Sequence, residues 1–156
     1  MKNRRMTNSR RANGLFVAFM VLGMASIAIA YAMTIPGQVH DPTEFELSMF
    51  LWLDKTNMNE FRQGHVCLHF ARELKKNALN HGINMSLVLC DLSLVEGQTE
   101  WRIEGHALNG VRLANGTFLL VEPQTDQIIP YNHLEEHLRA FLGLKNLLIR
   151  KVVVEW

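Results

Sequence analysis

The sequence predicts an α+β domain behind an N-terminal membrane anchor. Three patterns support this: a charge-free apolar segment near the N-terminus, helical spacing of apolar residues up to about residue 80, and strand-type patterning with a hairpin signal beyond it. Of the 156 residues, 48% are hydrophobic and 20% charged, with 16 Lys+Arg against 15 Asp+Glu. This length fits one ordinary domain, and the balanced charge excludes nucleic acid as an expected partner.

Residues 15–33 (LFVAFMVLGMASIAIAYAM) contain no charged side chain. As a helix this segment would be about 28 Å long, close to the roughly 30 Å hydrocarbon core of a bilayer. The residues before it include five basic side chains and no acidic one, Lys2, Arg4, Arg5, Arg10 and Arg11. The positive-inside rule therefore predicts a cytoplasmic tail at 1–14, a transmembrane anchor at 15–34 and an extracytoplasmic domain at 35–156.

The expected location is thus a cell membrane that the chain crosses once, with the lipid bilayer as a partner. A cleaved signal peptide is the alternative, because residues 28–30 (AIA) and 30–32 (AYA) are typical of cleavage sites. The apolar segment is longer than the 7–15 residues of a signal peptide's hydrophobic region, which favours an uncleaved anchor.

Two helices are expected next. The first begins at Asp41-Pro42, where Asp is an N-cap and Pro takes the first helical position. Its apolar stripe is expected to be buried and consists of Phe45, Met49, Trp52 and Leu53. The second helix spans about residues 65–80 (HVCLHFARELKKNALN), and His81-Gly82 provides its stop.

Strand patterning follows at residues 84–95, 101–113 and 117–122, with the hairpin signal Asn115-Gly116 between the last two. If these two residues form the loop, partners across the hairpin have numbers that sum to 231. A short strand at Ile128-Ile129, an amphipathic helix at 132–142 and a pairing β-rich segment at 147–156 complete the α+β domain.

Three residues carry the expected chemistry: Cys67, His106 and Glu122. Backbone N–H groups at a helix start favour a thiolate, so Cys67 is a candidate nucleophile. A histidine on the sheet can take its proton, and an acid on the next strand can hold the imidazole. In the expected register His106 faces position 125, so a longer loop or a bulge is needed to bring Glu122 level with it.

The sequence resembles the transglutaminase-like, papain-related superfamily over about residues 60–130. The matching motifs are Cys67-Leu68-His69-Phe70-Ala71, Gly82-Ile83, Gly105-His106-Ala107 and Leu120-Val121-Glu122-Pro123-Gln124-Thr125-Asp126. The resemblance implies Cys67 as nucleophile, His106 as base and Glu122 as orienting acid. It also implies hydrolysis or acyl transfer at amides of a protein or peptide substrate, without a cofactor.

The sequence departs from the family pattern at two places. Family members more often carry Asp at the position of Glu122, and an aromatic residue often follows the His-Ala pair, where this chain has Leu108-Asn109. Asp126 is therefore an alternative acid. Candidate donors to the oxyanion are the Cys67 N–H, the Gln63 side chain and, more weakly, Asn59.

Three other interpretations stay open at this point. The domain could be a binding or assembly module that keeps the fold without catalysis, or Cys67 could form a disulfide with Cys90, although the apolar strand around Cys90 favours a core position. The pattern H-x-x-E-H from His133 to His137 matches inverted zincins. A zinc site needs a third ligand, and the only acid after His137 is Glu155, so we expect a solvated helix face and no metal.

Overall fold

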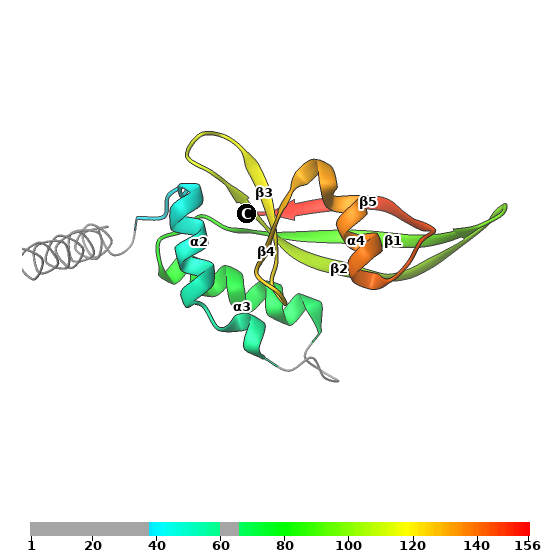
Figure 1. Cartoon of the computed structure of the whole chain (residues 1–156), viewed down its shortest axis with the longest axis horizontal. Helices are drawn as coiled ribbons and strands as arrows, with labels where there is room; N and C mark the ends of the chain where they lie inside the picture. Colours follow the sequence, from blue (N-terminus) through cyan, green and yellow to red (C-terminus); the bar gives the residue numbers. More distant parts are fainter. Residues whose placement is uncertain (1–37, 60–65) are drawn as a thin grey trace, which may run out of the picture. The chain divides into compact units, whose positions relative to one another are not determined.

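Five strands and three helices form the part of the chain that the computed structural model describes, residues 38–59 and 66–156. The helices are α2 (Glu44–Leu53), α3 (Cys67–Asn80) and α4 (Leu134–Leu142), with short 3-10 turns η1 (Thr56–Met58) and η2 (Tyr131–His133). The strands are β1 (Ser86–Glu96), β2 (Thr99–Arg112), β3 (Phe118–Glu122), β4 (Gln127–Pro130) and β5 (Leu147–Glu155). They form one antiparallel sheet in the order β4-β3-β2-β1-β5, so the predicted α+β class is confirmed (Figure 1).

The predicted basic tail (1–14), the predicted transmembrane segment (15–34) and Gln63 lie outside the described residues. Within 38–59 and 66–156, no helix combines the length and the apolar character needed to cross a membrane.

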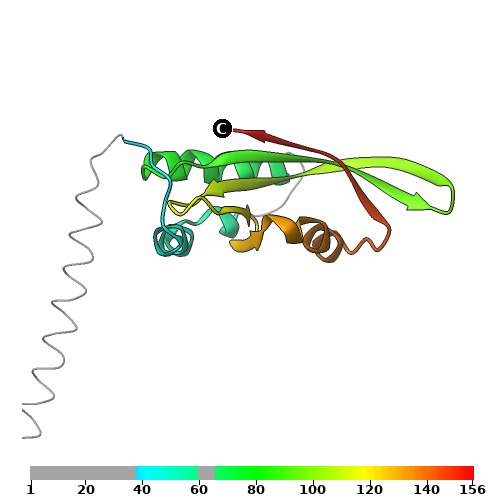
Figure 2. The same ribbon diagram turned by 90° about the horizontal axis from the view of Figure 1, so that it is seen from above.

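Helices α3 and α4 cover opposite faces of the sheet (Figure 2). On the α3 side, Ala71 packs with Leu87 and Ala107. On the α4 side, Leu138 packs with a larger set that includes Leu120. Because neighbouring residues of a strand point to opposite faces, the odd-numbered positions of β2 from His106 to Arg112 face α3 and the even-numbered ones face α4.

The start of α2 differs from the prediction. Thr43, not Asp41, is the N-cap: its Oγ1 accepts from Glu46 N at 3.2 Å, and Glu46 Oε2 accepts from Thr43 N at 2.7 Å. This reciprocal pair is a capping box, which satisfies two backbone donors at once. Asp41 instead accepts a hydrogen bond from Asn84 Nδ2 at 3.0 Å, which ties the segment before α2 to the start of the sheet.

The predicted burial of the α2 stripe is also wrong. Phe45, Trp52 and Leu53 are 61%, 77% and 54% exposed. The core instead takes three other apolar residues of this helix, Leu47, Phe50 and Leu51. The helix is apolar on both sides, so spacing alone could not decide which side faces the core.

The β2–β3 register is shifted by one from the prediction. Asn109 pairs with Val121 and Arg112 with Phe118, so partner numbers sum to 230. The turn has three residues, 114–116, closed by the bond from Leu113 N to Thr117 O at 2.8 Å, with Gly116 at φ +86°. A one-residue shift moves every side chain to the other face, so the even-numbered residues of both strands now share a face.

The C-terminal predictions are confirmed in outline. The expected short strand is β4, α4 ends before Gly143 at φ +69°, and the last strand β5 pairs antiparallel with β1. One detail differs: residues 131–133 form the 3-10 turn η2, and the α-helix begins only at Leu134.

Candidate active site

Cys67 is the first residue of α3. The preceding Val66 is extended (φ −103°, ψ 176°), and the backbone turns into the helix where His69 N donates to Val66 O at 2.7 Å. In return the Val66 N–H donates to His69 Nδ1 at 3.2 Å, which fixes the first turn around the cysteine. The Cys67 side chain is half-buried. At this end of a helix, free N–H groups and the macrodipole favour a negative sulfur.

A buried amide holds α3 in place against the sheet. Asn109 is fully buried, and its Nδ2 donates to the carbonyl oxygens of Ala71 at 2.8 Å and of Ser86 at 3.2 Å. Ala71 lies one turn after Cys67, so these bonds fix the distance between the start of α3 and strand β2. From the sequence alone, Asn109 was identified only as a departure from the family pattern.

His106 lies in β2 beside an irregularity of the sheet. Strand β1 shifts its register between Cys90 and Leu92, and Gly105 lies opposite this shift. A side chain at Gly105 would collide with the Cys90 carbonyl oxygen, so glycine permits the close approach of the two strands there. The neighbouring His106 is 5% exposed.

Glu122 and His106 form a hydrogen bond on the α4 face of the sheet. His106 Nε2 lies 2.7 Å from Glu122 Oε2, and Glu122 is fully buried. Extending the β2–β3 register by one position places Leu108 opposite Glu122, so His106 is its diagonal neighbour on the same face. This explains how a glutamate, with one methylene more than aspartate, reaches the imidazole.

The thiol of Cys67 interacts with His106, and this interaction lowers the pKa of the thiol and raises that of the imidazole. Since Nε2 faces Glu122, Nδ1 is the nitrogen left for the sulfur. Burial raises the pKa of Cys67, but the bonds from His106 and from the backbone of Ala107 and Leu68 outweigh it and lower the pKa overall.

The pKa of the His106 imidazole shifts in the opposite direction. Burial lowers the pKa of His106, but hydrogen bonds and charges from Cys67 and Glu122 raise it to about 9. A lowered cysteine pKa beside a raised histidine pKa favours the thiolate–imidazolium form of the pair.

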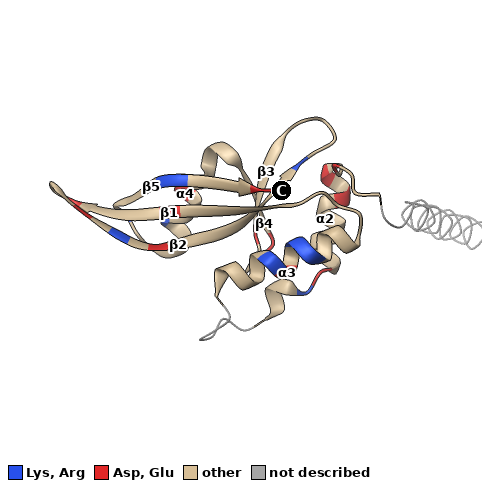
Figure 3. Cartoon of the chain, turned by 180° about the vertical axis from the view of Figure 1, so that it is seen from behind, with Lys and Arg blue, Asp and Glu red and all other residues tan. Residues whose placement is uncertain are grey.

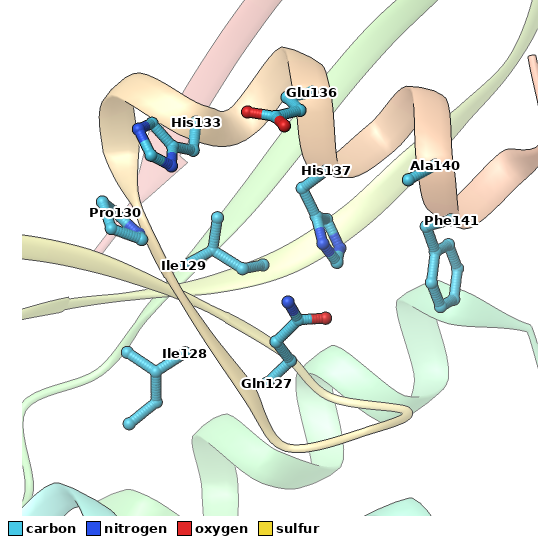
Figure 4. A pocket seen from close by; sticks show the side chains of 9 residues that line it. All are labelled: Gln127, Ile128, Ile129, Pro130, His133, Glu136, His137, Ala140 and Phe141. Atoms are coloured by element: carbon cyan, nitrogen blue, oxygen red, sulfur yellow. The ribbon is translucent and has the colours of Figure 1, made fainter.

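His137 is a further buried histidine at this site. Its Nε2 lies 3.3 Å from the same Glu122 Oε2 that binds His106. Phe141, one turn later on α4, stacks on the His137 ring at 5.6 Å between centroids and lies 5.1 Å from the His106 ring. Figure 4 shows His137 and Phe141 side by side on α4, on the wall of a hollow of about 440 Å³ between β4 and α4.

The sequence analysis weighed His137 as a metal ligand and expected a solvated helix face, which is wrong for His137, because the structure buries it. The signal that could have found its contact is its place on the apolar side of the amphipathic helix, since a buried imidazole needs a polar partner. In the described part of the chain, no group of three or more His, Cys, Asp or Glu side chains could hold a metal ion. His133 is exposed in η2, whereas His137 is buried against Glu122.

The other candidate residues lie elsewhere. Asp126 is near Asp54: burial and the charge of Asp54 raise the pKa of Asp126 to about 6. Asn59 donates to Glu73 at 3.1 Å on the surface. Both cysteines are free, and Cys90 is in the core, where burial and then the charge of Glu122 raise its pKa to about 12.

Comparisons with known proteins give weak structural similarity. No family model matches the sequence, and no curated protein matches it. The chain is similar in structure to protein-glutaminase (TM-score 0.46, 10% identity, 78% of this chain and 74% of that chain) and pro-protein-glutaminase (TM-score 0.46, 12% identity, 79% and 50%). It is also similar to a Polyporus squamosus lectin bound to an influenza-binding epitope (TM-score 0.43, 16% identity), covering 58% of this chain and only 34% of the lectin. With TM-scores below 0.5, these similarities do not define the family of the chain.

Proposed function

We propose that the chain is a membrane-anchored, cysteine-dependent hydrolase or acyltransferase that acts on peptide or side-chain amides. One observation carries the proposal: the His106 imidazole binds the fully buried Glu122 carboxylate and interacts with the partly exposed Cys67 thiol, whose pKa it lowers. This is the arrangement that an activated thiol nucleophile requires.

In the first half of the reaction, the Cys67 thiolate attacks the amide carbonyl carbon. The carbonyl electrons move to oxygen, and the N–H groups at the start of α3, including that of Cys67, are the candidate donors to this oxyanion. His106 then gives its Nδ1 proton to the leaving nitrogen as the C–N bond breaks. The products of this half are ammonia or an amine and a thioester on Cys67.

In the second half, His106 is neutral and takes a proton from the incoming nucleophile. Water gives hydrolysis and an amine gives acyl transfer, and in both cases the C–S bond breaks and the thiolate returns. Glu122 keeps the imidazole oriented and stabilises its charged form through the 2.7 Å bond. We assign His137 as a positioning residue, because it holds the oxygen of Glu122 that binds His106.

The experiment that tests the proposal separates three outcomes of amide chemistry. The purified full chain is incubated with a glutamine-containing protein, and we measure released ammonia, new amino termini and, with hydroxylamine present, hydroxamate. Ammonia indicates side-chain amide hydrolysis, new termini indicate peptide hydrolysis, and hydroxamate indicates a trapped acyl-enzyme. All signals should disappear in Cys67→Ser and persist in Cys90→Ser.

Absence of product would separate two alternatives, according to the reactivity of Cys67. If wild type gives no product while Cys67 still reacts rapidly with a small alkylating agent, the site is activated and the substrate class is wrong. If Cys67 is no more reactive than an ordinary thiol, the domain is a non-catalytic binding module.

The anchored part of the proposal has its own test. A protease added to intact cells should remove residues 40–156 and spare the basic tail, because the tail charges favour a cytoplasmic N-terminus. Protection of the whole domain would contradict this orientation.

A further inference from the structure

Helix α2 has two apolar faces, and only one of them is used by the core. The inner face holds Leu47, Phe50 and Leu51, which pack with α3 and the sheet. The outer face holds Phe45, Met49 and Trp52, which follow one another at the four- and three-residue spacing of one helix side. We call these three residues the outer α2 face.

Two residues of the outer α2 face, Phe45 and Trp52, are largely exposed, and Met49 is partly buried. Trp52 is the most exposed of the large apolar side chains in the described part of the chain, at 77%. Leu53, the last residue of α2, and Met58, in η1, are also exposed, at 54% and 74%. Single exposed apolar residues are common, but a contiguous group of large ones marks an interaction site.

The polar groups around this face are few and already satisfied. No charged residue lies between Leu47 and Leu53, and Figure 3 shows acidic colour only near the start of α2. The exposed Ser48 donates its hydroxyl to Glu44 O at 2.8 Å within the helix. The face therefore lacks the charges that a strongly acidic or basic partner would need, and it fits an apolar environment.

Chain length indicates what this environment is. The charge-free segment 15–33 ends only ten residues before α2 begins. Ten residues span at most about 35 Å even when fully extended. If segment 15–33 crosses a bilayer, α2 cannot be farther than that from its surface.

We propose that the outer α2 face lies in the interfacial layer of the bilayer that holds residues 15–33. Trp and Phe are enriched in this layer, and an amphipathic helix lying in the membrane plane inserts its apolar side by about 5–10 Å. The inner face stays in the domain core, so α2 fixes one side of the domain to the membrane. This inference requires insertion of residues 15–33 and is independent of the chemistry proposed for Cys67.

The test uses lipid quenching of tryptophan in the full chain. The sequence has three tryptophans, so the double variant Trp101→Phe/Trp156→Phe retains Trp52 as its single tryptophan. The matched control, Trp52→Phe with Trp156→Phe, leaves Trp101, which is 47% exposed near the turn between β1 and β2. Both variants are reconstituted into nanodiscs of phosphatidylcholine with or without bromine on the acyl chains.

We expect brominated lipid to quench Trp52 emission at least about twofold and to leave Trp101 nearly unchanged, because only the interfacial side chain reaches the acyl chains. Trp52 emission should also shift to the blue on transfer from detergent to nanodiscs. Equal, weak quenching of both tryptophans in chains that remain with the discs would overturn the proposal.

Two further outcomes would overturn it in different ways. If alkaline carbonate releases the chain from membranes, residues 15–33 do not anchor it and the premise is wrong. If Trp52 is shielded from soluble iodide without being quenched by brominated lipid, protein covers the face. Chains would then be cross-linked at low loading, with one chain per disc leaflet, and at higher loading. Cross-links between two chains would identify a second copy as the occupant.

Discussion

Glu122 Oε2 lies 3.3 Å from His137 Nε2 while it also accepts the 2.7 Å bond from His106. Glu122 Oε1 has a longer contact, 3.4 Å from Gln124 N. A fully buried carboxylate needs donors to remain charged, and both histidines supply them at one oxygen. The imidazole that faces Cys67 therefore depends on residues from β2, β3 and α4 together.

Glu122→Gln should slow alkylation of Cys67 by iodoacetamide at pH 7 by about tenfold or more, because a neutral amide stabilises the His106 imidazolium less. The measurement is the alkylation rate against pH, with far-UV circular dichroism to check the fold. Asp126→Asn is the matched control, since it also removes one carboxylate and should leave the profile unchanged. A slower rate in the control alone would move the orienting role to Asp126.

His137→Phe should move the acidic limb of the same alkylation profile to higher pH, by about half a pH unit or more. The phenyl ring keeps the stacking on Phe141 but removes a hydrogen-bond partner of Glu122, so the carboxylate is held less firmly against the His106 imidazole. His137→Gln retains an N–H donor and should restore part of the profile. His133→Gln, at the exposed neighbouring histidine, should have no effect.

A purely structural role for His137 would give a different result. Loss of this hydrogen bond should cost about 1.5–3 kcal/mol of unfolding free energy whatever its role in chemistry. Only a positioning role would also shift the pH profile of Cys67 alkylation. This profile is measured at temperatures where all variants are folded.

Cys67 should react at least about a hundredfold faster than Cys90 at pH 7, because reactivity follows the thiolate fraction and access. The pKa of Cys67 is lowered, whereas burial raises that of Cys90 to about 12. Mass spectrometry of peptides after timed alkylation measures both sites in one sample. Cys67→Ser should leave only the slow site, and comparable rates at the two sites would contradict the thiolate–imidazolium pair.

The stability of the domain should fall as pH rises through about 9. The folded pKa of His106 is about 9, above its usual 6.5, so the charged imidazole stabilises the fold fully below pH 6.5 and this contribution is lost above pH 9. Thermal unfolding between pH 7 and 10 should show a smaller decline for Glu122→Gln than for wild type. An equal decline in both would mean that other groups cause it.

The sequence predicted most elements, but not which faces of them are buried. Helix α3 and the strands were predicted within a few residues, because their apolar periodicity and their Gly stops are strong local signals. The outer face of α2 was wrongly expected in the core, since Phe45 and Trp52 carry the same apolar signal as the buried Leu47 and Phe50. Burial depends on neighbours that local periodicity does not contain.

Local sequence patterns also fell short at the candidate site, where the predicted β2–β3 register was off by one position. Cys67, His106 and Glu122 were chosen from local motifs and family resemblance, but the two-residue hairpin assumed from Asn115-Gly116 would have put Glu122 on the opposite face from His106. The three-residue turn corrects this by one position. The contact of His137 with Glu122 joins α4 to β3 across the sheet face, and no short-range pattern encodes such a contact.

Asp126→Asn should stabilise the domain at pH 7. Burial and the charge of Asp54 raise the pKa of Asp126 to about 6 from its usual 3.8, so the folded state holds a proton between these values that the unfolded state releases. Stability is therefore lost as pH rises from 3.8 to 6, and the cost persists at pH 7. Asparagine removes the charge and tolerates the backbone at φ +58°. After allowance for solvent screening of this partly exposed group, we expect a gain of about 0.5–1 kcal/mol.

The pH dependence of this gain identifies its cause. In urea unfolding, the difference between Asp126→Asn and wild type should vanish below about pH 3.8, where the aspartic acid is neutral in both states. Asp126→Ala is the matched control, because it also removes the charge but adopts a positive φ less readily. It should be less stable than Asp126→Asn at every pH. A gain that stays constant down to pH 3 would show that the charge near Asp54 is not responsible.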